Sequence, residues 1–260
     1  AVTVIIMENS GSEKYDGGLK TVTGYTVTSI SNELYKEADF TFVGNATAVG
    51  TDAGTYDMEL KPADFKNNNT NFKNVTFVIK DGKLTITKRN VTLTSANASK
   101  VYDGETLTND TVTVGGDGFA TGEGATYDVT GNQTAVGSSN NTFTYALNED
   151  TKAANYTIFK TEGKLDVTPI TDKVIVTITE NSGEYTYDGT TKNAKGYKVE
   201  TSNPLYTAAD FKFTGNATVT GTDVGTYAME LKPADFTNIS TNFSNVEFVI
   251  VDGTLTIKPA

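Results

Sequence analysis

The 260-residue chain contains no cysteine, no histidine and no tryptophan, and Arg89 is its only arginine. Without cysteine the chain forms no disulfide and performs no thiol redox chemistry. Without histidine it lacks the base that most nucleophilic triads use, and the common zinc sites need histidine or cysteine. The sequence therefore predicts a protein that is not an enzyme and that has no cofactor.

Positive charge and long apolar runs are also scarce. The chain has 21 basic and 32 acidic residues and a net charge of -11. No guanidinium cluster is available to bind phosphates, so nucleic acid is not an expected partner. The longest apolar runs, Val4 to Met7 and Phe248 to Val251, have four residues each, whereas a spanning helix needs about 20. The sequence predicts no membrane segment in this fragment, which we interpret as part of a longer chain.

What the chain does contain is a repeat. The segments 44–65 and 215–236 differ at four of 22 positions, which leaves 18 identical. The motifs ENSG, YDG and TNF accompany both copies in the same order, and a diverged middle copy carries YDG at 102–104. Such periodicity is typical of stacked modules. The sequence predicts three modules, 1–88, 89–169 and 170–260, joined by short linkers as a monomeric rod.

The periodicity within each module predicts strands. In the segment 83–87, Leu84 and Ile86 alternate with threonines, so the two apolar side chains are expected in the core. Asp81-Gly82 lies between two alternating runs and predicts a tight hairpin in which Gly82 takes a positive φ. Gly163 and Gly253 occupy the same place in the other copies. Only the LKPADF segments look helical, with one or two turns expected there.

A D-x-G-x-Y motif narrows the predicted fold. Tyr56 and Tyr227 end this motif, and a tyrosine in that position of an immunoglobulin-like sandwich bonds the backbone upstream with its hydroxyl. The sequence thus predicts an all-β fold of three tandem Ig-like β-sandwich modules arranged end to end, with at most one short helical turn in each. Modules like the β-grasp fold, with a short helix crossing the sheet, are the alternative.

Several motifs together resemble a known family. The run KVYDG at 100–104, the GTY strands, NYTI at 155–158 and the closing G-x-L-x-[IV] pattern are similar to the YDG and MBG-type tandem repeats of bacterial cell-surface adhesins. The resemblance covers all three modules and supplies no catalytic residues. It implies an extracellular location, at the cell surface or in the cell wall, and a role as a stalk or adhesive segment.

The predicted function is therefore a non-enzymatic stalk, spacer or adhesive repeat region that presents a distal binding domain away from the cell. The alternative is direct binding of a host glycan or mucin by the modules themselves. Aromatic rings supply flat faces for sugars, and the candidate residues in strand and loop regions are Tyr25, Tyr35, Tyr197 and Tyr206.

The sequence also contains candidate residues for three further chemistries. The acid pairs Glu59 with Asp64 and Glu230 with Asp235 lie beside a proline turn, where aspartate usually bonds backbone N–H groups, so a structural role is favoured over glycoside hydrolysis. A calcium ion at a module junction is an alternative that uses oxygen atoms around Asn9, Ser10, Glu13 and Asp16. The third is a Lys–Asn crosslink between Lys173 and Asn245, for which an ordinary solvated lysine is the simpler explanation.

Overall fold

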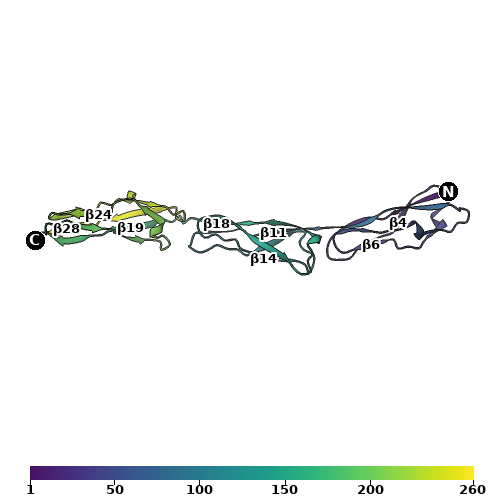
Figure 1. Ribbon diagram of the computed structural model, residues 1–260, viewed down its shortest axis with the longest axis horizontal. Helices are drawn as coiled ribbons and strands as arrows, with labels where there is room; N and C mark the ends of the chain where they lie inside the picture. Colours follow the sequence, from purple (N-terminus) through teal and green to yellow (C-terminus); the bar gives the residue numbers. More distant parts are fainter. The chain divides into compact units, whose positions relative to one another are not determined.

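The computed structural model describes all residues from 1 to 260. The chain consists of β-strands joined by loops and turns, and its only helices are five single turns of 3₁₀ helix (Figure 1). The main claim of the fold prediction, an all-β chain of tandem modules, is confirmed. No helix has the length and apolar character that crossing a membrane requires.

The chain divides into two compact units. The first unit contains residues 1–95, 110–129 and 143–162, and the second contains residues 96–109, 130–142 and 163–260. The division into three modules at 88 and 169 stays a prediction.

The elements follow in the order of the chain. Those of residues 1–88 are β1 (Val2–Glu8), β2 (Gly11–Lys14), β3 (Lys20–Thr23), β4 (Tyr25–Ile30), η1 (Glu37–Asp39), β5 (Phe40–Phe42), β6 (Thr47–Gly50), β7 (Gly54–Asp57), η2 (Pro62–Asp64), β8 (Phe65–Asn67), β9 (Val75–Lys80) and β10 (Lys83–Thr87). Those of residues 89–169 are β11 (Arg89–Ser95), β12 (Ala98–Val101), β13 (Val112–Gly116), β14 (Ala125–Val129), β15 (Gly137–Asn141), β16 (Phe143–Leu147), η3 (Ala153–Asn155), β17 (Tyr156–Thr161) and β18 (Gly163–Thr168). Those of residues 170–260 are β19 (Val174–Glu180), β20 (Gly183–Thr186), β21 (Lys192–Lys195), β22 (Tyr197–Thr201), η4 (Ala208–Asp210), β23 (Phe211–Phe213), β24 (Thr218–Gly221), β25 (Gly225–Ala228), η5 (Pro233–Asp235), β26 (Phe236–Asn238), β27 (Val246–Val251) and β28 (Thr254–Lys258).

Two three-stranded sheets organise the first repeat. Strand β1 is central in one sheet, antiparallel to β4 and parallel to β9. Strand β10 is central in the other, parallel to β2 and antiparallel to β7. The two-stranded antiparallel sheets β3–β6 and β5–β8 complete the repeat. Consecutive strands of the chain lie in different sheets at β1 and β2 and again at β9 and β10.

The same arrangement recurs along the chain. In the second unit, β19 pairs with β22 and β27, and β28 pairs with β20 and β25. The middle repeat contributes the sheet β13-β11-β17 to the first unit and the sheet β12-β18-β15 to the second. In every repeat the strands at the beginning therefore pair in parallel with the strands at the end.

Alternating side chains build the core of each sheet. Val4 and Ile6 of β1 are fully buried, and so is Leu84 of β10, with Ile86 nearly so. The orientation predicted for Leu84 and Ile86 is confirmed. Phe77 of β9 packs its ring against Phe40 of the two-stranded sheet β5–β8, with the ring centroids 5.2 Å apart. A three-stranded sheet therefore lies over a two-stranded sheet with an aromatic layer between them, as in a sandwich.

The hairpin predicted at Asp81-Gly82 is wrong. Strands β9 and β10 do not pair with each other, because both run parallel to the first strands of the repeat and lie in different sheets. Gly82 does not have a positive φ, nor do Gly163 and Gly253. A Cβ atom on Gly82 would lie 2.4 Å from the carbonyl oxygen of Glu8. Glycine is needed there for close approach of two backbones, not for a turn.

The proline turns agree with the prediction. LKPADF forms one turn of 3₁₀ helix, η2, and its second copy forms η5. Asp64 accepts a hydrogen bond of 2.7 Å from the backbone nitrogen of Lys61, which fixes the turn. Where a β-grasp module would have a helix crossing its sheet, this chain has only these single turns.

Candidate functional site

Two buried glutamates mark the points where the chain changes sheets. Glu8 is 3% exposed, and its carboxylate accepts hydrogen bonds from the backbone nitrogens of Leu60 at 2.6 Å and Gly82 at 2.7 Å. Glu180 does the same for Leu231 and Gly253. A carboxylate that accepts hydrogen bonds from two buried N–H groups stabilises the place where three segments meet. Sequence reasoning used the ENSG motif only as a repeat marker and missed this role.

The YDG motif forms the same turn in all three repeats. Asp16 accepts a hydrogen bond of 2.8 Å from the backbone nitrogen of Gly18, and Gly17 has a φ of 85°. Such a turn needs the short carboxylate of aspartate and the conformational freedom of glycine. Asp103 and Asp188 form the equivalent bonds. A neighbouring lysine ammonium and this backbone bond hold the pKa of each aspartate below its usual range.

The motif tyrosines form the bond that the D-x-G-x-Y pattern predicts. The hydroxyl of Tyr56 donates to the carbonyl oxygen of Asp52 at 2.8 Å, and that of Tyr227 donates to Asp223 at 3.0 Å. The rings close over Gly50 and Gly221, where a Cβ would lie within 2.5 Å of ring carbons. These tyrosines thus fix the entry to β7 and β25.

The four tyrosines considered for sugar binding are not on an open surface. Tyr35 and Tyr206 are 1% and 2% exposed and are among the largest fully buried side chains. Each ring fills the core beneath a proline- or glutamate-containing loop and stacks on a phenylalanine, so neither is available at the surface as a candidate for sugar binding. Tyr25 and Tyr197 are half-buried, with rings edge-on to phenylalanines. None of the four offers a free flat face.

Burial changes the chemistry of these phenols. The pKa of Tyr206 is raised to about 12, first because burial disfavours the phenolate and then because of the charge of Asp210. The pKa values of Tyr25, Tyr35 and Tyr197 are also raised, with burial as the main cause. All four are neutral hydrogen-bond donors at physiological pH.

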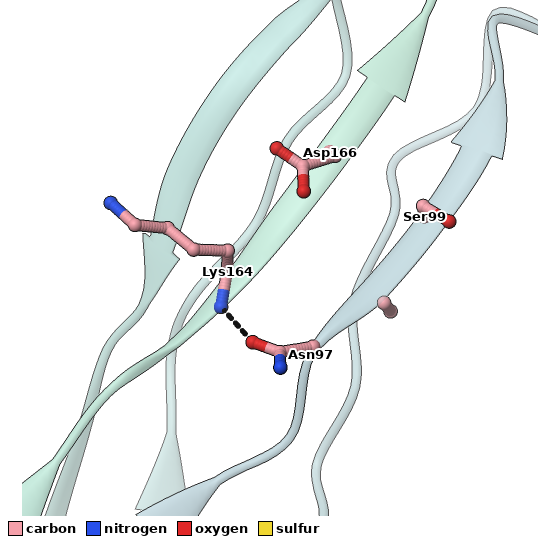
Figure 2. Close-up of a pocket in the computed structure, with 5 residues that line it drawn as sticks. Asn97, Ser99, Lys164 and Asp166 are labelled. Atoms are coloured by element: carbon pink, nitrogen blue, oxygen red, sulfur yellow. Dashed lines mark hydrogen bonds between the residues drawn. The ribbon is translucent and has the colours of Figure 1, made fainter.

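A polar hollow on β12 and β18 is the clearest surface that could accept a ligand. It has a volume of about 440 Å³ and is lined by Asn97, Ala98, Ser99, Lys164 and Asp166. Figure 2 shows the side chains projecting from two neighbouring strands, with the backbone nitrogen of Lys164 donating to Asn97 at 2.7 Å. The Lys164 ammonium donates to Asn140 at 2.7 Å.

The same hollow recurs in the third repeat on β20 and β28. It has a volume of about 280 Å³ and is lined by Ser182, Glu184, Thr254 and Thr256. Ser182 holds the place of Asn97, since it accepts a hydrogen bond of 3.1 Å from the backbone nitrogen of Thr254. The hollow is therefore a property of the repeated parallel strand pair. Its lining offers hydroxyl, amide and charged groups and no aromatic ring.

The other candidates do not assemble into reactive sites. Asp64 and Asp235 each bond a backbone nitrogen in their own turn, as the structural interpretation predicts. The Lys173 ammonium lies 2.6 Å from exposed Glu247, whereas Asn245 donates to the carbonyl oxygen of Thr171. The proposed crosslink partners are thus exposed and bonded elsewhere.

Two of the side chains considered for calcium, Ser10 and Asp16, have other partners. Ser10 accepts a hydrogen bond from the backbone nitrogen of Lys83, and Asp16 binds Gly18 and Lys20. No group of three or more acidic side chains is arranged to hold a metal ion.

Comparison with models of known protein families gives a match to this chain. The family model for the MBG domain matches residues 2–88 and 174–259, which is more than half of the chain. This chain belongs to the MBG domain family. MBG domains are typically structural or adhesive and not catalytic, and they are typical of extracellular surface proteins. The resemblance drawn from the sequence motifs is confirmed.

Other comparisons of the MBG chain are less informative. No protein with a curated description matches the sequence. Among solved structures, it is similar to the N-terminal eight Ig domains of Down Syndrome Cell Adhesion Molecule (DSCAM) isoform 1.30.30, at 12% identity and a TM-score of 0.16. That alignment covers 100% of this chain and 40% of the other. At this TM-score the likeness supports no conclusion about the fold or the function of this chain.

Proposed function

We propose that this chain is a load-bearing stalk or spacer of a bacterial cell-surface adhesin, placed between the cell and a distal binding domain. The observation that carries the proposal is the parallel pairing of first and last strands. In the third repeat, β19 pairs with β27 over six residue pairs, and β20 pairs with β28 over four. The same pairings occur in the other two repeats.

This geometry determines how a pulled repeat responds. A force on the two ends of the repeat draws β20 and β28 past each other along their length, because the strands are parallel and lie near the start and at the end of the repeat. The inter-strand hydrogen bonds are perpendicular to an antiparallel strand and slanted in a parallel pair, so such sliding strains all of them together. A spacer under tension needs this resistance. The buried glutamates join the same strands where they change sheets.

A matched pair of proline variants tests the proposal. Thr256→Pro removes a ladder N–H from β28, where Thr256 pairs with both Glu184 and Thr226. Thr237→Pro removes an N–H from β26 in the two-stranded sheet β23–β26, where Thr237 pairs with Lys212. At an equal loss of thermal stability, we expect Thr256→Pro to lower the single-molecule unfolding force more than Thr237→Pro. Equal losses of force would contradict the proposal.

Direct glycan or mucin binding is the second candidate, and the repeated polar hollow favours it. Asn97, Ser99 and Asp166 offer the amide, hydroxyl and carboxylate groups that sugars bind. We would apply the 260-residue chain to immobilised mucin and a glycan array, with Asp166→Ala as the test variant and Asp128→Ala, also on a middle-repeat strand, as the control. Saturable binding that only Asp166→Ala removes would establish this function.

A further inference from the structure

One carboxylate joins two tyrosines of neighbouring repeats within the first compact unit. Glu123, in the loop between β13 and β14, accepts hydrogen bonds from the hydroxyls of Tyr15 at Oε1 and Tyr156 at Oε2. Both tyrosines are 4% exposed, and their rings lie edge-on with the centroids 5.7 Å apart. Tyr15 belongs to the first repeat and the other two residues to the middle repeat. We call this contact the first junction.

The backbone orients the groups of the first junction. The backbone nitrogen of Ala120 donates to the hydroxyl oxygen of Tyr156 at 2.9 Å, which directs the proton of that hydroxyl to Glu123. Beside this cluster, the backbone nitrogen of Ala53 in the first repeat donates to Oδ1 of Asn155 in the middle repeat at 2.7 Å. The amide of Ala53 therefore reports whether the first junction is closed.

The equivalent contact inside the second unit, the second junction, is built on a different ring pair. Tyr102 of the middle YDG motif lies edge-on to Phe243, with the centroids 5.8 Å apart. Phe243 stands where the first junction has Tyr156, since each follows an asparagine that binds an amide of the preceding repeat. In the second junction, the backbone nitrogen of Val136 donates to Oδ1 of Asn242 at 2.9 Å. Phenylalanine has no hydroxyl, so two phenols cannot share a carboxylate there.

The charge of Glu123 determines how strongly the first junction is held. A carboxylate accepts hydrogen bonds at both oxygens, and bonds to an ionised acceptor are about twice as strong as neutral ones. In a protonated carboxyl one oxygen donates, yet the hydroxyls of Tyr15 and Tyr156 both direct their protons at it. One of the two bonds must then be lost or reversed. Because Ala120 holds the hydroxyl of Tyr156, we expect the bond to Tyr15 to be lost.

The two phenols do not change their charge in neutral or acidic solution. Burial, followed by the hydrogen bond to Glu123, raises the pKa of Tyr15, and the same two causes raise the pKa of Tyr156 to about 12. Both hydroxyls therefore stay neutral donors. Of these three side chains, only the carboxyl can take up a proton as the pH falls.

The other charged groups of the first junction already have partners. The ammonium of Lys152 interacts with Glu123 through its charge and lies 2.8 Å from Asp52. The ammonium of Lys14 lies 2.6 Å from Asp117. The bonds from these lysines are the largest cause that holds the pKa of each aspartate below its usual range, so both aspartates keep their charge in mildly acidic solution.

The remaining cation of the first junction is Arg89. Its guanidinium donates to the backbone oxygens of Tyr15, Asp117 and Gly118 and therefore binds both repeats through groups that do not titrate. Its charge also acts on Tyr156.

We infer that Glu123 makes the first junction sensitive to acid: when its carboxylate takes up a proton, the bond to Tyr15 is lost and the junction opens more often. Glu123 is partly exposed, so the proton can come from solvent. The contact favours the ionised carboxylate, so its stabilisation is present at neutral pH and is lost as the pH falls. The second junction keeps its closed state. The inference does not depend on the stalk function, since it concerns one contact inside one unit.

Hydrogen exchange of the 260-residue chain tests the inference with an internal reference. Protection of the Ala53 amide measures closure of the first junction, and protection of the Val136 amide measures closure of the second. After correction for the intrinsic effect of pH on exchange, we expect protection of Ala53 to fall about tenfold or more between about pH 7 and about pH 4, as the loss of one charge-assisted hydrogen bond requires. Protection of Val136 should stay unchanged.

Three variants assign the response to the carboxylate. Glu123→Gln is neutral at every pH, so it should show low protection of Ala53 at neutral pH and no further fall in acid. Tyr15→Phe keeps the ring and the carboxyl but removes the bond, and it should also abolish the fall. Glu149→Gln, at an exposed glutamate of the same repeat, should behave as the parent chain.

Three results would overturn the inference. The first is protection of Ala53 that is unchanged in the parent chain down to about pH 4. The second is an equal fall for Ala53 and Val136, because acid would then act on the whole chain. The third is a fall that persists in Glu123→Gln or in Tyr15→Phe, which would make another carboxyl, such as that of Asp52, the group that responds.

Discussion

At the residue scale, two buried carboxylates define the architecture. Glu8 and Glu180 are charged side chains in a chain with few buried polar groups, and each satisfies two backbone donors from distant segments. Burial removes water from each carboxylate, but its oxygens bond N–H groups that would otherwise be unsatisfied in the core. These glutamates therefore act as tertiary connections in a chain without disulfides.

Removing one of them gives a first prediction. Glu180→Ala leaves the N–H groups of Leu231 and Gly253 without an acceptor, so we expect a loss of about 2–5 kcal/mol in the free energy of unfolding. Urea unfolding followed by circular dichroism measures this loss. Glu184→Ala, four residues away, removes an exposed pair with Lys258 and should leave the transition nearly unchanged. Similar transitions for the two variants would show that the buried bonds contribute little.

The buried phenol of Tyr206 predicts a response to alkaline pH. Its pKa is raised from 10.0 to about 12, so folding favours the neutral phenol over the phenolate. The resulting stabilisation is fully present below pH 10 and is lost as the pH rises from 10 to 12. Tyr206→Phe should reduce the fall in melting temperature over this interval, measured against the parent chain. An unchanged fall would contradict the assignment to this residue.

At the element scale, the sequence predicted the strands better than their pairing. The alternation of Leu84 and Ile86 and the proline at the start of η2 are local signals, and the structure agrees with them. The crossing between β9 and β10 was not predictable from the DG pair, because a hairpin and a crossing share the same local pattern. What distinguishes the crossing is Glu8, which is 74 residues from Gly82 in the sequence and accepts a hydrogen bond from its backbone nitrogen.

The burial of the candidate tyrosines was also not predictable from local sequence patterns. Tyr35 and Tyr206 appear in loop-like sequence, yet both are buried, because the loop folds over the aromatic layer formed by distant phenylalanines. A period-two pattern reports the side of a strand, but no such pattern exists for a residue in a loop. The YDG turns were predictable, since their bonds join residues two positions apart.

Gly82 provides a prediction for the crossing itself. Gly82→Ala would place its Cβ 2.4 Å from the carbonyl oxygen of Glu8, so two backbones must separate. We expect a loss of about 1–3 kcal/mol, as for other overpacked sites. In Gly18→Ala, the Cβ would meet only the flexible carboxylate of Asp16 at 3.1 Å, and the effect should be within about 0.5 kcal/mol. Thermal unfolding of both variants decides whether close approach is the reason for glycine at 82.

At the scale of the whole molecule, near-identical repeats provide their own controls. Tyr15 and Tyr187 occupy the same turn, but only Tyr15 has a neighbouring ring and a carboxylate to bind. Tyr15→Ala should therefore cost about 3–5 kcal/mol, as for other buried aromatic residues, and Tyr187→Ala should cost little. Hydrogen exchange around Tyr156 measures the first effect. A small cost for both variants would mean that the ring contact does not join the repeats.

The eight ion pairs add little to this account, since all involve partly exposed side chains and such pairs contribute modestly. The apolar cores, the buried glutamates and the parallel strand pairs are the features that repeat. The proposal that the chain bears tension rests on these repeated features.

The unfolding force in two pulling geometries tests that claim most directly. The chain has no cysteine, so engineered cysteines give unique attachment points. Pulling through the two chain ends slides β20 along β28. Pulling between cysteines introduced by Lys173→Cys and Ser202→Cys instead separates β19 from β22 one residue pair at a time. These two positions lie at the same end of the β19–β22 ladder, where the backbone nitrogen of Ser202 donates to the carbonyl oxygen of Ile175. The account predicts a clearly higher force through the chain ends. Equal forces, or a lower force through the ends, would contradict it.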